Sequence, residues 1–350
     1  MIKYVNIYKI IILIIVIIIV ISCVSYNIGI SAVSKEDKPV TIEIEENNTY
    51  LSIAEQLKEN NLIRSQTFYK IYVRIFKPNN LQVGSYNLNE NMSVKELINN
   101  LENNATNKNP TFVIQEGKHI TDIALAISEA TDLKEKELLD FWGNKDFINT
   151  LIDKYWFIDE NVKNQKLKYN LEGYFFPATY KIKENSTKEE TTYMMLDKMD
   201  EVLTNYKTEI ENSKFSVHEI LTLASIVENE AILDKERPII AGVFINRLNI
   251  DMPLQSCATI GYAIGQWKLS YTNKDLAVDS PYNTYKYYGL PVGPGNMPGE
   301  NSIKAVLYPN KNDYLFFVAN VFDSENKQSY FSKTYSEHQE KCLDILGKSC

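Results

Sequence analysis

The chain begins with a long apolar stretch that predicts a membrane-spanning helix. Lys3 and Lys9 precede twelve consecutive apolar residues, 10–21, and no further charge occurs before Lys35. A bilayer core requires about 20 mostly apolar residues at helical rise. Positive charges before such a stretch tend to stay in the cytoplasm. We therefore expect residues 1–34 to form a cytoplasmic tip and a single transmembrane anchor in the cell (inner) membrane, with the rest of the chain extracytoplasmic.

Two alternatives to a retained anchor remain open at this stage. A cleaved signal peptide is one, although its apolar region is normally shorter and ends in small residues. Lipidation of Cys23 is the other, because VISC (20–23) loosely matches a lipoprotein cleavage site. All three interpretations leave the protein tethered to the membrane or exported.

An internal repeat follows the short charged segment 34–39, which we expect to be a stalk. TIEIEENNTYLSIAEQL (41–57) aligns without gaps to TFVIQEGKHITDIALAI (111–127). In both copies alternating apolar and polar positions are followed by turn residues and then by apolar residues at helical spacing, which predicts strand, turn and helix. The residues that recur at an offset of 70 are Thr41, Ile44, Glu46, Ile53 and Ala54.

A second pair of similar segments extends each copy of the repeat. YNLNENMSVKEL (86–97) and YKIKENSTKEET (180–191) both read as a strand followed by the capping-box start of a helix. Residues 40–104 are thus expected to form a strand–helix–helix–strand–helix unit. Residues 110–192 are expected to form a second such unit, interrupted by a helical insert (133–168). Small β-α-α-β modules outside the cytoplasm often bind cell-wall glycan, and a spacer without a ligand is the open alternative.

The pattern changes again in the last part of the chain, residues 216–350. Ser216 with Glu219 predicts the capped start of a helix that contains LTLASIVENEAILDKER (221–237), and Pro238 is expected to end or bend that helix. A second apolar helix (239–248), a region of ordered loops (251–300), a buried strand (312–320), and a final strand and helix (330–346) follow. The fold class predicted for the whole chain is α+β, with a mixed α/β region from residue 110 to 350.

Composition narrows the possible functions. The chain has 350 residues, is 44% hydrophobic and carries a formal charge of −8, so it has no basic surface of the kind that binds nucleic acid. The four cysteines are too few and too scattered for a disulfide framework; Cys342 and Cys350 could pair, but free thiols are the simpler expectation. The three histidines lie far apart in the sequence, so neither a metal site nor another cofactor is expected.

One acidic residue lies within an apolar stripe. At about 100° per residue, Glu228 falls at the centre of the face formed by Leu221, Ala224, Ala231 and Ile232. Burial there is expected to raise the pKa of the carboxyl, as a general acid for a glycosidic oxygen requires. A structural Glu paired with an arginine, such as Arg237 or Arg247, remains the alternative.

Glycosidases commonly use two carboxylates. Glu230 points about 200° around the helix from Glu228, and Glu236 lies about 12 Å farther along the axis, so neither supplies a second carboxylate beside Glu228. One reaction requires a single carboxyl. In it the 6-hydroxyl of a muramic acid residue attacks its own C1, and a 1,6-anhydro sugar is released without water.

Several segments, in order, resemble the YceG-like endolytic murein transglycosylases, the MltG family. The most specific are LASIVENEA, ERPIIAGVFINRL, MPLQSCATIGYAIG and SPYNTYKYYGLPVGPGNMPGENSIKAVLYP, and the resemblance covers about residues 40–345. It implies a single-span inner-membrane anchor, a LysM-like module at 40–104 and a catalytic domain at 110–350 with its catalytic glutamate on a helix. It also implies cleavage within nascent peptidoglycan strands, limiting their length. The family's catalytic glutamate falls on Glu228.

The resemblance also suggests residues that contact the substrate. These are Gln255, Thr259, Asn283, Thr284, Tyr285 and Asn296. For Gln255 a loop cap, and for 283–285 a hydrogen-bonded turn, are the structural alternatives. Tyr174 and Phe176 are considered as a sugar-stacking surface or as core. The chain departs from the family at Cys257–Ala258, where many members have Asp-Pro, and at Ala178, where Asp is frequent.

The function expected is therefore that of a membrane-anchored lytic transglycosylase that cleaves the MurNAc-GlcNAc β-1,4 bond of glycan strands. The resemblance implies partnership with glycan polymerases and with divisome or elongasome proteins. A non-catalytic peptidoglycan-binding scaffold is the main alternative. A hydrolase that uses water is a further alternative, and its products would carry reducing ends.

Overall fold

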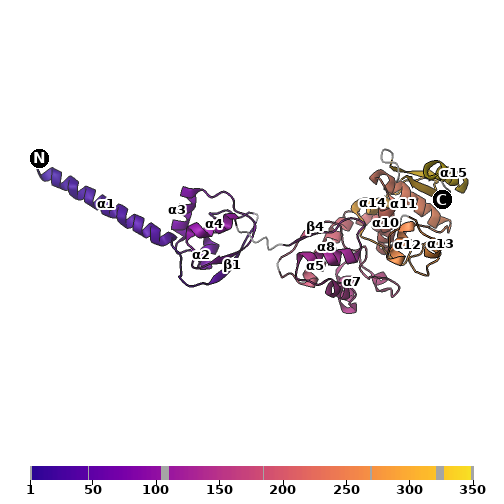
Figure 1. Cartoon of the computed structure of the whole chain (residues 1–350), viewed down its shortest axis with the longest axis horizontal. Helices are drawn as coiled ribbons and strands as arrows, with labels where there is room; N and C mark the ends of the chain where they lie inside the picture. Colours follow the sequence, from indigo (N-terminus) through magenta and orange to yellow (C-terminus); the bar gives the residue numbers. More distant parts are fainter. Residues whose placement is uncertain are drawn as a thin grey trace. The chain divides into compact units, whose positions relative to one another are not determined.

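The computed structural model describes residues 2–45, 47–103, 110–183, 185–268, 270–320 and 327–347, and side chains from residue 9 onward except 10 and 11. The chain divides into two compact units, residues 1–110 and 111–350. Figure 1 follows the elements along the sequence.

The first unit begins with the apolar helix α1 (Ile2–Ile30). Its segment Ile12–Ile30 is long and apolar enough to cross a membrane. The end of α1 packs on α3 (Gln66–Phe76) so closely that a Cβ added at Gly29 would lie 2.1 Å from the ring of Phe68. The predicted stalk is hydrogen-bonded to the rest of this unit. The N–H of Ser34 donates to Glu90 O, and the N–H of Lys38 donates to Asn89 Oδ1.

The remaining elements of the first unit follow the predicted order. Strand β1 (Pro39–Ile44) is followed by α2 (Ala54–Glu59), α3, β2 (Gly84–Asn89) and α4 (Val94–Asn103). The two strands pair antiparallel, with Ile42 opposite Tyr86. Alternate strand residues and one face of each helix enclose a separate apolar core, as the period-2 and period-3.6 patterns require. Most of the predicted linker after α4 lies outside the described residues.

The second unit opens with the other copy of the repeat. Strand β3 (Thr111–Val113) leads to α5 (Ile120–Ala130) and pairs antiparallel with β4 (Thr179–Lys181), as β1 pairs with β2. The predicted helical insert is confirmed: it contains α6 (Glu135–Trp142), α7 (Lys145–Lys154) and the 3-10 turn η1 (Glu160–Lys163). The capping box predicted at Thr187 and Glu190 starts α8 (Lys188–Thr204).

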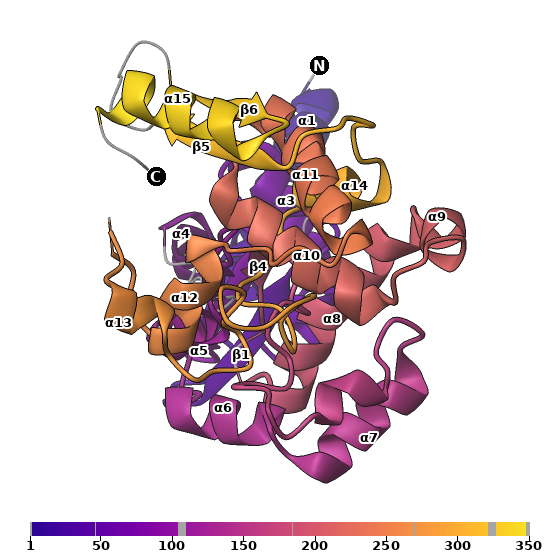
Figure 2. The same cartoon turned by 90° about the vertical axis from the view of Figure 1, so that its right-hand side faces the viewer.

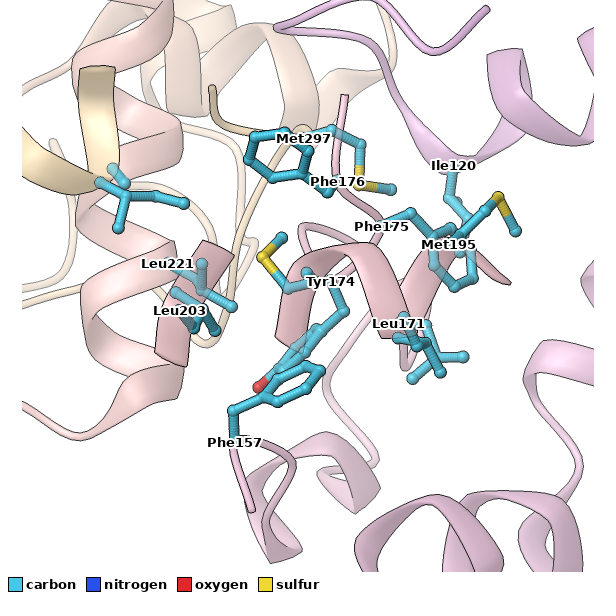
Figure 3. Packing of buried hydrophobic residues seen from close by; sticks show 14 of the residues in the cluster. Ile120, Phe157, Leu171, Tyr174, Phe175, Phe176, Met195, Leu203, Leu221 and Met297 are labelled. Carbon is cyan, nitrogen blue, oxygen red and sulfur yellow. The ribbon is translucent and has the colours of Figure 1, made fainter. Parts of the chain in front are cut away.

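The core of the second unit joins the repeat to the C-terminal region. Figure 3 shows Tyr174, Phe175 and Phe176 packed among residues from several elements, including Leu221 of α10 (Val217–Glu230). Tyr174 is fully buried, and its hydroxyl lies 2.8 Å from His218 Nδ1. Tyr174 and Phe176 are therefore core residues and not a sugar-stacking surface.

The C-terminal region is mainly helical. Helix α10 packs on α11 (Arg237–Asn249) and α14 (Glu300–Leu307), and these helices lie side by side in Figure 2. Short helices α9 (Lys207–Glu211), α12 (Cys257–Ile264) and α13 (Asn273–Leu276) separate longer loops. The hairpin of β5 (Phe316–Asn320) and β6 (Gln328–Ser332) precedes α15 (Tyr335–Leu346). The expected mixture of helices and short antiparallel strands is confirmed.

Two sequence expectations for this region were wrong in detail. Helix α10 ends at Glu230, because Ala231 is already extended, and Pro238 starts α11 instead of ending α10. A proline in the first turn of a helix loses no hydrogen bond there. Cys342 is disulfide-bonded, so the expectation of a free thiol was wrong for this residue. Its expected partner, Cys350, lies outside the described residues.

A buried carboxyl ties the repeat to α12. Glu172 is 1% exposed; it accepts hydrogen bonds from the N–H of Ile120, at the start of α5, and from the hydroxyl of Tyr262, on α12. Burial raises the pKa of Glu172 to about 8. The folded protein therefore keeps this proton over a pH range in which the unfolded chain releases it.

We expect this proton to make stability depend on pH. Between about pH 4.5 and 8 the folded state binds more protons than the unfolded state, so the free energy of unfolding falls as pH rises. The total change is several kcal/mol, at about 1.4 kcal/mol per pKa unit. Glu172→Gln keeps an acceptor and a neutral side chain and should flatten the profile. Denaturant titrations of the full chain in detergent at several pH values, followed by tryptophan fluorescence, measure this.

The control for this experiment is Glu189→Gln, at an exposed position in the first turn of α8. It should retain the pH profile of the wild type. Parallel profiles for the wild type and Glu172→Gln would show that Glu172 is not the group responsible.

Candidate active site

Glu228 lies in the last turn of α10, beside the buried residues Ala224 and Val227. Its side chain is only 6% exposed. The carboxyl of Glu228 thus has little contact with solvent at the end of a largely buried helix. Ala231 and Ile232 follow the end of the helix, so the predicted apolar face is shorter than the helical wheel suggested.

Both carboxylate oxygens of Glu228 have a donor. Arg237 Nη1 lies 3.0 Å from Oε1, and the backbone N–H of Gly299 donates to Oε2 at 2.9 Å. Gly299 is the N-cap residue of α14, where the helix dipole also favours negative charge. The carboxyl is therefore held in one orientation by the positive charge of Arg237 and by the backbone N–H of Gly299.

Arg237 is itself fixed by two further contacts. Its Nε donates to Asp234 Oδ1 at 2.9 Å, and its Nη1 donates to Ser302 Oγ at 2.6 Å. Burial acts to lower the pKa of Arg237, but the contacts with Asp234 and Glu228 together outweigh it, so the pKa of Arg237 is raised. The structural alternative considered for Glu228, pairing with an arginine, is therefore present, and the partner is Arg237. Arg247 instead donates to the carbonyls of Leu315 and Leu254.

The loop 293–299 runs along the same side of α10. The N–H of Gly295 donates to Ser225 Oγ, Asn296 Nδ2 donates to Ser225 O, and three residues later Gly299 binds Glu228. Ser225 and Glu228 are one turn apart, so they follow one line on the helix surface. The Gly- and Pro-rich loop is thereby positioned against the candidate catalytic carboxyl.

The residues predicted at 255–285 form a hydrogen-bonded loop network. Thr259 Oγ1 lies 2.9 Å from Thr284 Oγ1, which also accepts from the N–H of Ser256. Asn283 is 1% exposed; its amide donates to two carbonyls and accepts from the N–H groups of residues 285 and 286. The structural alternative proposed for YNTY, a hydrogen-bonded turn, is therefore present.

Tyr285 and Gln255 differ from their neighbours in this network. The Tyr285 hydroxyl lies 3.2 Å from Cys257 Sγ, and burial raises the pKa of that hydroxyl. Gln255 has an exposed side chain on a left-handed backbone with φ 47°, anchored by its N–H to Thr284 O. Of these residues, Gln255 has the side chain that a ligand reaches most easily.

Asn296, one of the predicted substrate-contacting residues, lies in the loop that contacts Glu228. It lines a small pocket with Ser225, Asn229 and Thr259, with space of about 10 Å³, enough for one water molecule. Its Oδ1 is buried and has no hydrogen-bond partner among the described residues, while its Nδ2 is bound to α10. A water molecule or a donor group of a ligand is needed to satisfy this oxygen.

A second carboxyl near Glu228 was missed by the sequence analysis. Glu116 lies in the loop between β3 and α5, and the negative charge of Glu228 contributes to raising its pKa, after burial. Helical spacing reveals only carboxyls near Glu228 along its own segment, whereas Glu116 belongs to a distant part of the sequence. In the sequence, Glu116 aligns with Glu46 of the first copy of the repeat, and this match was interpreted only as part of the repeat.

The chain is similar to proteins of known family. A model of the YceG-like family matches residues 42–343. The endolytic murein transglycosylase of Bacillus subtilis is 38% identical over 87% of this chain and 85% of its own length. Two Streptococcus pneumoniae proteins of the same name, from strains D39 and R6, are each 35% identical over 86% of this chain, which spans only 58% of their length.

A solved structure agrees with these matches. The crystal structure of a YceG-like protein of Listeria monocytogenes superimposes with a TM-score of 0.63 at 36% identity, covering 87% of this chain and all of that one. The family match spans both the repeat and the region that carries Glu228. The chain therefore belongs to the YceG-like family.

Proposed function

We propose that this protein is an endolytic peptidoglycan lytic transglycosylase. It cleaves the MurNAc-GlcNAc β-1,4 bond inside nascent glycan strands and leaves 1,6-anhydroMurNAc ends, which limits strand length. The observation that carries the proposal is Glu228, a carboxyl that is 6% exposed and held by Arg237 and by the N–H of Gly299. The names of the Bacillus and Streptococcus relatives support the same reaction.

The reaction moves two protons and uses no water. One proton goes to the departing glycosidic oxygen, and another leaves the C6 hydroxyl as its oxygen bonds to C1. A carboxyl with little access to solvent suits this chemistry, because water at the same position would hydrolyse the bond instead. Glu228 is positioned to exchange protons with the substrate, while Gln255 and Asn296 offer amides to its hydroxyl and N-acetyl groups.

The first unit would place this chemistry at the membrane. We assign α1 as a single-span anchor of the cell membrane, with residues 35–350 on the extracytoplasmic side. The repeated β-α-α-β units at 40–104 and 110–192 are assigned as LysM-like modules that bind glycan, and 216–350 as the catalytic core. Glycan polymerases and divisome or elongasome proteins would act at the same strands.

The length distribution of treated strands tests this proposal. The full chain, reconstituted in lipid nanodiscs, is incubated with uncross-linked glycan strands, and the products are separated by size. An endolytic enzyme shortens the mean strand length early, before disaccharides accumulate. Strands that bind the protein but keep their length would support the non-catalytic scaffold instead.

A further inference from the structure

We infer that helix α3 docks the first unit on the extracytoplasmic leaflet of an anionic membrane. The exposed apolar residues at its end, Ile75 and Phe76, enter the region between headgroups and acyl chains. The basic residues Lys70, Arg74 and Lys77 contact the lipid phosphates. This inference rests on the proposed function only for the assignment of α1 as a membrane anchor, and it adds a lipid-binding surface on residues that the reaction does not use.

Side-chain hydrogen bonds attach the start of α3 to the end of α1, and Figure 1 shows the two helices meeting there. Arg64 Nε donates to Ala32 O at 2.8 Å, and Arg64 Nη2 donates to Val33 O at 3.0 Å. Both carbonyls belong to the chain just after α1, and Ser65, the residue after Arg64, is the N-cap of α3. The connection between the apolar helix and the first unit is therefore held by the start of α3.

The contacts between the two helices show that α3 runs back along α1. Phe68, in the first turn of α3, lies against Gly29, and its ring also packs edge-on against Tyr26, with ring centroids 5.8 Å apart. Tyr72, one turn further along α3, lies near Tyr26: burial raises the pKa of Tyr72, and the phenol of Tyr26 adds to the increase. Residue numbers thus rise along α3 as they fall along α1. The last turn of α3 therefore points back toward the apolar part of α1.

That last turn exposes two large apolar side chains. Ile75 and Phe76 are each 62% exposed, although Phe76 stacks on Tyr72 with ring centroids 4.3 Å apart. Phe68 and Ile75 are seven residues apart, so they lie on one stripe of the helix surface. Helix α1 covers this stripe at Phe68 and leaves it open at Ile75. The lipid that surrounds α1 would continue the cover that α1 itself provides at Phe68.

Positive charge accompanies this apolar end. Residues 60–89 contain four basic residues and no acidic residue, in a chain with a formal charge of −8. Three of the four lie on α3 or at its C-cap, and within the described parts of the chain these three form no ion pair: Lys70, Arg74 and Lys77. Basic residues beside an exposed apolar face are typical of helices that bind in the plane of an anionic membrane. Charge complementarity therefore favours anionic phospholipid as the partner of this surface.

Quenching by brominated acyl chains tests whether residue 76 reaches the lipid. The chain has three tryptophans, all of them beyond residue 110, so Phe76→Trp adds the first fluorophore of this kind to the first unit. The full chain is reconstituted in phosphatidylglycerol nanodiscs with or without bromine on the acyl chains, and the wild-type emission is subtracted. Brominated lipid should remove more than about half of the added emission, because the apolar face of an interfacial helix lies about 5–10 Å into the headgroup and acyl boundary.

Thr67→Trp is the matched control on the same helix. Thr67 is exposed in the first turn of α3, and nine residues of helix place it about 13 Å from residue 76 along the axis. Brominated lipid should remove less than about a tenth of the emission that this tryptophan adds. Quenching in Phe76→Trp that is no greater than in Thr67→Trp would overturn the inference.

The charge of the lipid provides a second readout. Quenching in Phe76→Trp should fall at least about two-fold in phosphatidylcholine discs, and equally in phosphatidylglycerol discs when Arg74→Glu and Lys77→Glu are added. Adding Lys58→Glu and Lys95→Glu instead makes the same change of charge at exposed positions on α2 and α4, and it should leave the quenching unchanged. Equal quenching in both lipids and in both charge variants would overturn the assignment of an anionic surface.

Two further outcomes have separate signatures. If a second copy of the chain covers the end of α3, lipid will not quench the added tryptophan of Phe76→Trp, and its emission will differ between discs that hold one copy and two; this would overturn the inference. If α1 is not an anchor, the wild type will not co-elute with the discs. The measurement uses no glycan, so a failure of the proposed reaction would leave the quenching unchanged.

Discussion

Replacing Glu228 by glutamine is expected to lower the rate of strand cleavage about 10³- to 10⁴-fold. Glutamine has nearly the same size and can still accept from the N–H of Gly299, but it neither gives nor takes a proton. General acid–base catalysis commonly contributes factors of this size. The measurement is the initial rate of anhydro-end release from glycan strands, with strand binding measured in parallel.

A second carboxyl on the same helix provides the control. Glu219 is exposed in the first turn of α10, where its carboxylate accepts from the N–H of Ser216 in the capping box. Glu219→Gln preserves that acceptor, because a glutamine also completes a capping box, and should leave the rate within a few-fold of the wild type. Equal rates for Glu228→Gln and the wild type would remove Glu228 from the reaction.

Replacing Arg237 by methionine is expected to be the most destabilising of the substitutions considered for this site. The arginine side chain is 10% exposed, and its loss leaves the buried carboxylate of Glu228 without a counter-charge. Breaking a buried ion pair from one side typically costs about 3–5 kcal/mol. Denaturant unfolding of the full chain in detergent measures this cost, and the strand assay should show lost activity as well.

A double variant separates the charge effect from lost packing. In Arg237→Met/Glu228→Gln the unpaired charge is gone, so this protein should be more stable than Arg237→Met alone. The difference is the coupling between the two residues. If the single and double variants unfold at the same denaturant concentration, the pair is not what stabilises this region.

Periodicity predicted the fold where local pattern and burial agree. The apolar run 10–21, the strand–helix–helix–strand–helix order of residues 40–104 and the capping boxes at Ser216 and Thr187 all recur in the structure. The repeat at an offset of 70 corresponds to two strands that each pair antiparallel with a later strand. These features depend mainly on residues that are close together in the sequence, so they can be predicted from it.

The site was predictable only in part, because its contacts join distant segments. The apolar face of α10 drew attention to Glu228, and its pairing with an arginine was the structural alternative to a catalytic role. The donor at Gly299 lies 71 positions away and acts through its backbone, which no side-chain pattern reveals. Glu116 reaches the site through pairing of Gly117 and Lys118 with Met297, so neither spacing nor composition identifies it.

The fate of solvent oxygen tests the central claim most directly. The full chain digests glycan strands in water enriched in heavy oxygen, and the new muramic acid ends are analysed by mass spectrometry. Proton exchange through Glu228 without a water nucleophile predicts anhydro ends that contain no heavy oxygen. Reducing ends that carry one heavy oxygen atom each would show hydrolysis and contradict the account.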